Sequence, residues 1–179
     1  MLQKPTSKSD QRCNLILKLW QRNQTTHGGK GFLRLDDLLR EMRSASVQAP
    51  FLSSLYFSGA DVDHPFFLKS DDIALGLAVL PQDAEKAGQA KRHPHQTEVI
   101  FVLDGSLRLL YQSHDKTEAR VLKRGDYFAI SKNVCHWVEP VEGVEAAYLF
   151  VKTAPARQPR EEDCNKSGGQ RQDSDKAPK

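Results

Sequence analysis

Two histidines separated by one residue, His93 and His95, are followed by Glu98, and a third histidine, His136, comes about forty residues later. If the segment around 93–98 is a β-strand, residues i and i+2 point to the same face, so the imidazoles of His93 and His95 enter one cavity. Three neutral imidazoles and one carboxylate suit a divalent transition metal and leave one or two coordination positions for water or a substrate. The pattern therefore predicts a metal site with these four residues as ligands. It suits Fe, Mn, Ni, Cu or Zn at an open site better than a structural zinc site, which cysteines more often close.

The elements that must position these residues are short strands. Beyond residue 50 the chain consists of short β-branched or aromatic runs with turn residues in nearly every gap. Many short strands at regular spacing predict an antiparallel sandwich or barrel. Asp104-Gly105 lies between two apolar runs and predicts a hairpin, because a tight hairpin turn needs positive φ. The predicted strands cover residues 51–57, 66–69, 73–80, 98–103, 106–111, 119–122, 127–130, 135–138 and 146–152.

Two helices are expected before the strands. A short amphipathic helix is predicted near 10–22, where Leu15, Ile16, Leu19 and Trp20 recur at helical spacing. A second helix opens at Asp36 or Asp37, and its apolar stripe consists of Leu35, Leu38, Leu39 and Met42. The connector between them is too long and too rich in glycine for a helix-turn-helix, and no basic recognition face emerges. We expect the helices to cap one end of the barrel and not to bind nucleic acid.

Together these residues resemble the cupin superfamily, whose barrel carries two sequence motifs. The first contains Gly, His-x-His, Glu and Gly, and the second contains Gly and His. The matching residues are Gly88, His93, His95, Glu98 and Gly105 in the first motif and Gly125 and His136 in the second. The resemblance covers roughly residues 73–152. It implies an all-β antiparallel double-stranded β-helix, the jelly-roll or cupin barrel, and a metal held by the motif histidines and glutamate.

The motifs depart from the family pattern at two places. Only Gln96 and Thr97 separate His95 from Glu98, where three or four residues are usual, so Glu98 is in doubt as a ligand and Gln96 is an alternative oxygen ligand. In the second motif Ser131-Lys132-Asn133 replaces the usual Pro-x-Gly, and Pro140 replaces the closing Asn. Asn tolerates the left-handed conformation, so we expect Asn133 to keep the turn.

Several apolar residues are candidates for the wall of the metal pocket. Alternation places Ile100 and Val102 on the same side as Glu98, and Tyr127 and Phe128 lie on the strand that follows Gly125. Ordinary core packing explains all four equally well. Cys135 alternates with His136 and faces away from the cavity, as an inert buried thiol.

The 179 residues, 39% of them hydrophobic, fit one domain with appendages. We expect 1–9 to be disordered, 10–50 to form the helical extension, and 51–154 to form the β-barrel. Residues 155–179 contain no Leu, Ile, Val or aromatic residue, which predicts a disordered tail. Truncation after about Thr153 is therefore expected to leave thermal stability nearly unchanged.

Charge and cysteine content indicate which partners and which cellular compartment to expect. The balance of 26 basic and 23 acidic residues does not argue for nucleic acid or a membrane as a partner. No stretch reaches the ~20 apolar residues of a bilayer span, and three widely spaced cysteines make a disulfide framework improbable, so a cytoplasmic protein is expected. Residues 99–103 are apolar at every position, which predicts that a second sheet covers one face of this strand and that the amino-terminal helices or a second copy of the chain cover the other. We expect a homodimer.

The leading functional hypothesis is a metal-binding cupin that acts on a small organic molecule, as an Fe(II)-dependent dioxygenase. One alternative is a non-catalytic module that binds a sugar or other metabolite. A second alternative is a sugar isomerase or epimerase with a histidine as general base, which would need an acid partner such as a tyrosine in the cavity.

Overall fold

The structure is a computed structural model that describes residues 11–12, 14–18, 21, 34–49, 53–59, 68–70, 72–82, 90–113, 116–153 and 162–164. Residues 11–12, 14–18 and 21 are helical, as predicted for 10–22. Helix α2 spans Leu35–Gln48, so it begins just before Asp36 and Asp37, which lie in its first turn. The strands are β1 (Ser54–Gly59), β2 (Leu68–Lys69), β3 (Ile73–Leu80), β4 (Lys91–Arg92), β5 (Glu98–Ser113), β6 (Lys116–Lys123), β7 (Tyr127–Ile130), β8 (His136–Pro140), β9 (Ala146–Thr153) and β10 (Glu162–Asp163).

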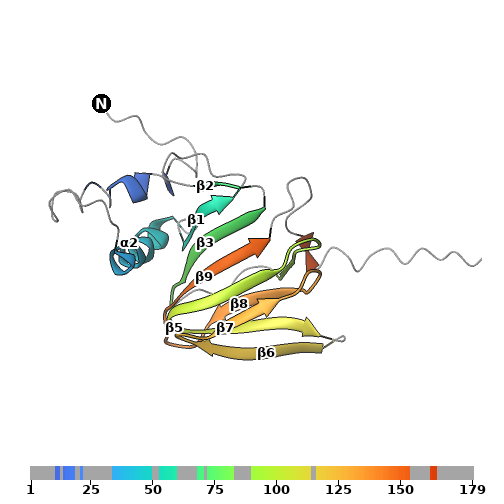
Figure 1. Cartoon of the computed structure of the whole chain (residues 1–179). Helices are drawn as coiled ribbons and strands as arrows, with labels where there is room; N and C mark the ends of the chain where they lie inside the picture. The colour runs from blue at the N-terminus through green and yellow to red at the C-terminus, as the bar shows by residue number, and fades with distance from the viewer. Residues whose placement is uncertain are drawn as a thin grey trace, which may run out of the picture.

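The long strand β5 belongs to two sheets. Its first half pairs with β7 and β9, and this sheet continues through β3 and β1 to β2. Its second half pairs with β6 and β8, and β8 continues to β4 and β10. All pairs are antiparallel except β1 with β2. The two sheets curl into a half-barrel (Figure 1), which confirms the predicted antiparallel β-barrel class.

The predicted hairpin at Asp104-Gly105 is wrong, because β5 continues through these residues as one strand and the chain does not reverse there. Gly105 does have positive φ, at 68°, and the register of β5 against β9 shifts between Val102 and Asp104. A Cβ on Gly105 would lie 1.8 Å from the carbonyl oxygen of Glu145. Glycine at this position therefore makes a β-bulge, which bends a strand and increases its twist, instead of a chain reversal. The bend lets one strand enter both sheets.

Two hydrophobic clusters lie on opposite faces of the first sheet. The outer cluster packs both helical segments against β1, β3 and β9, and its buried members are Ile16, Leu38, Leu39, Met42, Leu55, Leu77, Val79 and Ala147. The inner cluster fills the half-barrel with Ile100, Val102, Leu107, Leu109, Leu122, Ile130 and Ala146. Arg43 of α2 also forms an ion pair with Asp104 at 2.7 Å, and its hydrogen bond holds the pKa of Asp104 below the ordinary value. This ion pair thus holds helix α2 against the bulge in β5.

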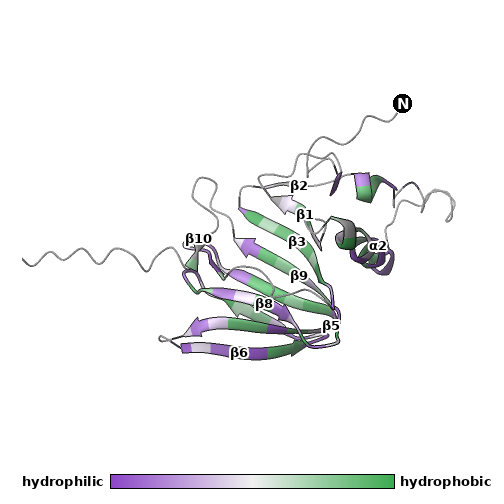
Figure 2. Cartoon of the chain, turned by 180° about the vertical axis from the view of Figure 1, so that it is seen from behind, coloured by the Kyte–Doolittle hydropathy of each residue, from purple (hydrophilic) through white to green (hydrophobic). Residues whose placement is uncertain are grey.

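Part of the outer face of the first sheet stays exposed beyond the helices. Phe101 of β5 and Tyr127 of β7 are paired across the strands and stack with ring centroids 5.6 Å apart, with exposures of 40% and 66%. Ile73 of β3 is also exposed. Figure 2 shows the contrast between the largely hydrophobic β3 and the largely hydrophilic β6. Among the described residues, no helix is both long and apolar enough to cross a bilayer.

Residues 162–164 correct two expectations. Part of the tail predicted to be disordered forms β10, which pairs with β4, and the N–H of Cys164 donates to the carbonyl of Ala90 at 3.1 Å. Cys135 and Cys164 form a disulfide with Cα atoms 6.0 Å apart, although the sequence suggested reduced thiols. The alternation that turns Cys135 away from His136 also turns it toward the tail. The cysteine argument for a cytoplasmic setting therefore no longer holds, because disulfides are rare in the cytosol.

The disulfide leads to a stability prediction. Closing the loop between cysteines 29 positions apart should lower the entropy of the unfolded chain and stabilise the fold by about 3 to 4 kcal/mol. In urea unfolding without reductant, Cys164→Ser should lose about that much free energy of unfolding, while Cys13→Ser, which leaves both bonded cysteines in place, should match the wild type. A reductant should bring the wild type close to the Cys164→Ser value. Equal stability of all three proteins without reductant would show that the tail adds nothing.

We propose that the exposed part of the outer sheet face pairs two copies of the chain. Light scattering at micromolar concentration should give twice the 20.2 kDa of one chain. Phe101→Lys places a charge on this face and should give monomers, whereas Val121→Lys, at a similarly exposed position on β6, should leave the dimer intact. A wild-type mass of one chain would exclude the dimer.

Candidate metal centre

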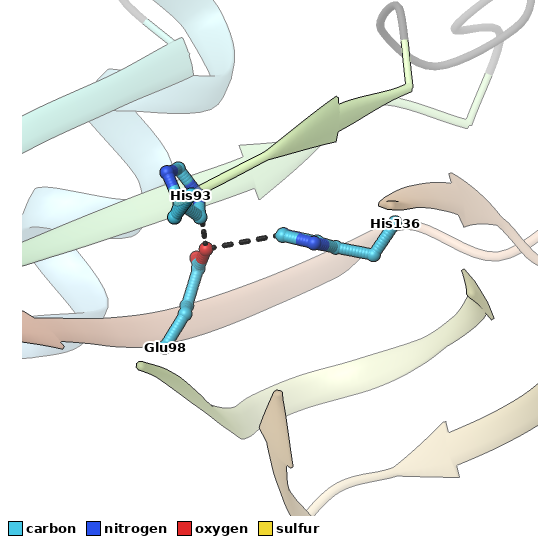
Figure 3. Close-up of side chains that lie close together, drawn as sticks. All are labelled: His93, Glu98 and His136. Atoms are coloured by element: carbon cyan, nitrogen blue, oxygen red, sulfur yellow. Dashed lines mark hydrogen bonds and ion pairs between the residues drawn. The ribbon is translucent and has the colours of Figure 1, made fainter. Parts of the chain in front are cut away.

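Three buried side chains from different segments converge on one point inside the half-barrel. The Nε2 atoms of His93 and His136 lie 2.9 Å and 3.2 Å from the same carboxylate oxygen of Glu98, Oε2. Figure 3 shows the two imidazoles reaching this carboxylate from different directions. One nitrogen or oxygen atom from each of the three residues lies within 4.8 Å of the others. Such a cluster of two imidazoles and one carboxylate has the composition of a metal site.

Local backbone geometry holds each of the three residues in place. Glu98 is the first residue of β5 and His136 the first residue of β8, so both lie where a strand starts. His93 follows the end of β4, and its carbonyl accepts a hydrogen bond from the N–H of Asn133 at 2.9 Å. Asn133 has φ of 66°, which confirms that it keeps the left-handed turn in place of glycine. This turn joins the segment of His93 to the start of β8.

A fourth charged group, Lys152, completes the surroundings of Glu98. Lys152 is the cross-strand neighbour of Glu98 on β9, and its Nζ lies 3.6 Å from Oε2. Burial by itself raises the pKa of Glu98, but its side-chain contacts with His136 and His93 and the charge of Lys152 outweigh it and leave the pKa well below its ordinary range. The ionised carboxylate therefore contributes stability at neutral pH, and this contribution is lost as the pH falls below the range in which a free glutamate titrates.

The hydrogen bonds of His136 test whether this donor set fits a metal ion. Its Nδ1 lies 2.9 Å from the carbonyl oxygen of Val134, and because a carbonyl can only accept, Nδ1 carries a proton. In the neutral ring the Nε2 atom is then a lone pair that faces the carboxylate of Glu98. Two acceptors at 3.2 Å need a cation between them, either a proton or a metal ion. A backbone carbonyl that orients the far nitrogen is also the usual partner of a metal-binding histidine, so the residues fit a metal.

The prediction that His93 and His95 enter one cavity is wrong. The chain leaves β4 after Arg92 and bends at Pro94 and His95, so the alternation of a strand does not apply, and His95 lies exposed outside the cluster. Four residues separate His93 from Glu98, and three or four are usual between the second histidine and the glutamate of the family pattern. The spacing of His93 from Glu98 is therefore compatible with that of the second motif histidine.

Glu98 lies at the centre of the cluster, within hydrogen-bond distance of both histidines. The proposed substitute Gln96 is buried, and its Oε1 has no hydrogen-bond partner in the described part of the chain. Of the four predicted wall residues, Ile100 and Val102 are buried in the inner cluster and Phe128 packs against it. Tyr127 is 66% exposed on the outer face, because it alternates with the inward-facing Phe128, and it cannot line a pocket around Glu98.

Lys152 is the residue that the sequence analysis missed. Alternation along β9 places it on the same face as the buried Phe150, and its Nζ lies 5.4 Å from the centroid of that ring. A lysine on an inward-facing position at the end of an apolar strand is a signal that the sequence does contain. Its pairing with Glu98 depends on the register between β5 and β9, which the sequence does not reveal.

Comparison with known proteins gives a family and distant structural neighbours. Residues 76–152 match the family described as Cupin domain. Curated protein sequences give no significant match. Oxalate oxidase in complex with glycolate is 19% identical, with a TM-score of 0.44 over 52% of this chain and 46% of that chain. A cupin-like protein from Thermotoga maritima is 19% identical, with a TM-score of 0.45 over 62% of this chain and 73% of that chain.

A third neighbour is the oxalate decarboxylase of Bacillus subtilis, whose structure was used to study its Mn(II) centres. It is 18% identical, with a TM-score of 0.45 over 54% of this chain and 25% of that chain. The chain thus spans less than half of the oxalate oxidase chain and a quarter of the decarboxylase chain. The family match at residues 76–152 contains β4 to β8 whole and β9 except for its last residue, together with His93, Glu98 and His136, so this part of the chain is a cupin domain.

Proposed function

We propose that the protein binds one divalent transition metal through His93, Glu98 and His136 and uses it to act on a small organic molecule, as an Fe(II)-dependent dioxygenase. The observation that carries the proposal is the buried cluster of two imidazoles and one carboxylate. Two histidines and one carboxylate are the ligand set of non-haem Fe(II) oxygenases, which keep positions open for substrate and O2. The loss of His95 from the predicted set strengthens this assignment, since three ligands leave more positions open than four.

When bound, the metal supplies a Lewis acid, and iron supplies in addition the redox chemistry of O2 activation. The protein's own residues position and shield it. The hydrogen bond from Nδ1 of His136 to Val134 fixes the ring so that Nε2 points at the shared site. Ile100 lies on the same face of β5 as Glu98 and is 1% exposed. It belongs to the inner cluster, whose apolar side chains exclude water from the side of the site that faces the interior of the half-barrel. Reactive species are protected from side reactions in such surroundings.

The non-catalytic alternative loses its main support. It depended on a short first motif that would displace Glu98, whereas Glu98 lies within hydrogen-bond distance of both histidines. The isomerase alternative needs an acid partner such as a tyrosine in the cavity. Tyr127 is exposed on the outer face, and the hydroxyl of Tyr111 donates to Glu118 at 2.6 Å in an exposed position, whereas Tyr148 packs against the inner cluster. The position of Glu98 therefore favours the metal-dependent oxygenase over the non-catalytic module, and the isomerase is the second candidate because Tyr148 lies against the inner cluster.

The metal site is tested by elemental analysis of protein purified without chelator. The wild type should carry close to one metal per chain, and the double variant His93→Ala/His136→Ala should lose it. His95→Ala is the matched control from the same segment, and it should keep its metal because His95 lies exposed outside the cluster. Loss of metal in the control would return His95 to the ligand set. A wild type that takes up no metal even after reconstitution would end the proposal.

The open positions are tested with nitric oxide, which stands in for O2 and needs no knowledge of the substrate. Protein loaded anaerobically with Fe(II) should give the EPR signal of a high-spin iron nitrosyl, because three protein ligands leave positions free. The double variant should give no such signal at the same added iron. Full iron content without a nitrosyl signal in the wild type would mean a closed site and would exclude the dioxygenase.

A further inference from the structure

Strand β4 leads the chain to His93, and a disulfide joins the strands on either side of it. In the order of the sheet, β4 lies between β10 and β8. Cys164 directly follows β10 and Cys135 directly precedes β8, so the bond between their sulfurs links the two neighbours of β4 covalently. The neighbours of this short strand therefore stay together while the bond is intact.

The tail also binds the segment before His93 directly. The two residues of β10 pair with the two residues of β4, and the N–H of Cys164 donates to the carbonyl of Ala90 at 3.1 Å. Residues 90–92 end directly before His93, so these contacts help to hold its imidazole 2.9 Å from the carboxylate of Glu98. Two strands of two residues make too few contacts to stay paired alone. The pairing therefore depends on the covalent bond that holds Cys164 in place.

The other two candidate ligands have supports that do not involve the tail. His136 begins β8, which pairs along its whole length with β5, and the carbonyl of Cys135 accepts the N–H of Gln112 at 2.8 Å. Glu98 belongs to the part of β5 that pairs with β7 and β9. Loss of the disulfide therefore reaches His136 through its neighbour Cys135 and acts most strongly on His93.

We propose that the disulfide between Cys135 and Cys164 is a redox switch for the metal site, whose reduction weakens metal binding by releasing the segment of His93. The proposal rests on the proposed function, because metal affinity is the property that the switch controls. A ligand residue that is already ordered binds a metal more tightly than one that must be ordered on binding, since the second pays the entropy of ordering. The oxidised protein therefore holds metal tightly and the reduced protein holds it weakly.

A dithiol, as a small molecule or a protein, is the reductant that the switch needs. Cys164 is half-buried and Cys135 is buried, so a thiolate of the dithiol attacks the Sγ atom of Cys164 and Cys135 leaves as a thiolate. The second thiol of the dithiol then displaces Cys164. Two electrons and two protons pass from the dithiol to the two cysteines, and the dithiol is oxidised to a disulfide.

The experiment measures the affinity of the full chain for Co(II), by competition with a chromophoric chelator in the absence of oxygen. Oxidised wild type is compared with wild type that a dithiol has reduced before the dithiol is removed, and with Cys164→Ser, which needs no reductant. Cys13→Ser keeps both bonded cysteines and is the matched control. Leu39→Ala truncates a side chain of the outer cluster and is the control for lower stability with the disulfide intact.

Reduced wild type and Cys164→Ser should bind Co(II) at least about 10-fold more weakly than oxidised wild type, which is an ordinary size for coupling between two sites. Cys13→Ser and Leu39→Ala should match the oxidised wild type, and reoxidation should restore the affinity of the reduced protein. Equal affinity of oxidised and reduced wild type overturns the proposal. An equal loss in Leu39→Ala also overturns it, because lower stability alone then explains the effect.

Hydrogen exchange without metal shows where reduction acts. The amides of residues 90–93 should exchange faster in the reduced protein, while those of β9, in the other sheet, should keep their rates. Faster exchange along the whole chain would mean that reduction unfolds the domain, and it would overturn the switch. Unchanged exchange at residues 90–93 would overturn it as well.

The Co(II) titration separates this failure from failure of the proposed function. An oxidised wild type that binds no Co(II) overturns both, since no metal site then exists for the switch to control. An oxidised wild type that binds one Co(II) per chain, with an affinity that reduction does not change, overturns only the switch and leaves the metal site established.

Discussion

The compensation of one buried negative charge is the constraint on which the site depends. An ionised carboxylate taken out of water is stable only when hydrogen bonds and opposite charges surround it. Glu98 obtains these from His93, His136 and Lys152, which belong to three separate segments. The ionised Glu98 is therefore stable only when all three segments hold their side chains against its carboxylate. The same arrangement gives a metal ion its ligands, so the stability of the fold and the geometry of the site have a common cause.

The bend in β5 makes this convergence possible. Glu98 lies at the start of the strand, in the sheet with β9 and Lys152, while the far half of the strand pairs with β8, which begins at His136. Without the bulge at Gly105 a strand of this length would stay in one sheet, and the two halves would not face a common interior. Arg43 of α2 forms ion pairs with Asp104 and with Glu145 on either side of the bulge. The helical extension thus supports the bend that forms the site.

The sequence predicted the class of fold well, because strand periodicity and the family motifs are local signals. Strands β3 and β7 have the bounds expected for them, and the apolar stripe of α2 is buried except for Leu35. The failures occurred where tertiary structure overrides a local rule. Gly105 makes a bulge and not a turn. Both structures need a residue with positive φ, so a glycine in the sequence does not distinguish them. His95 was assigned by strand alternation, but a bend at Pro94 interrupts the strand. Lys152 was missed because the register between strands cannot be read from one sequence.

The disulfide shows how a segment without a hydrophobic side chain can still belong to the fold. A strand of two residues such as β10 or β4 contributes too few contacts to be stable by itself. The covalent bond between Cys164 and Cys135 supplies what the missing apolar contacts do not, and it holds β10 against β4. Strand β4 in turn pairs through Lys91 with His136 and leads directly to His93. The bond therefore joins the tail to the two short segments that carry His93 and His136. Reduction of the disulfide should thus loosen the positions of both histidines as well as that of the tail.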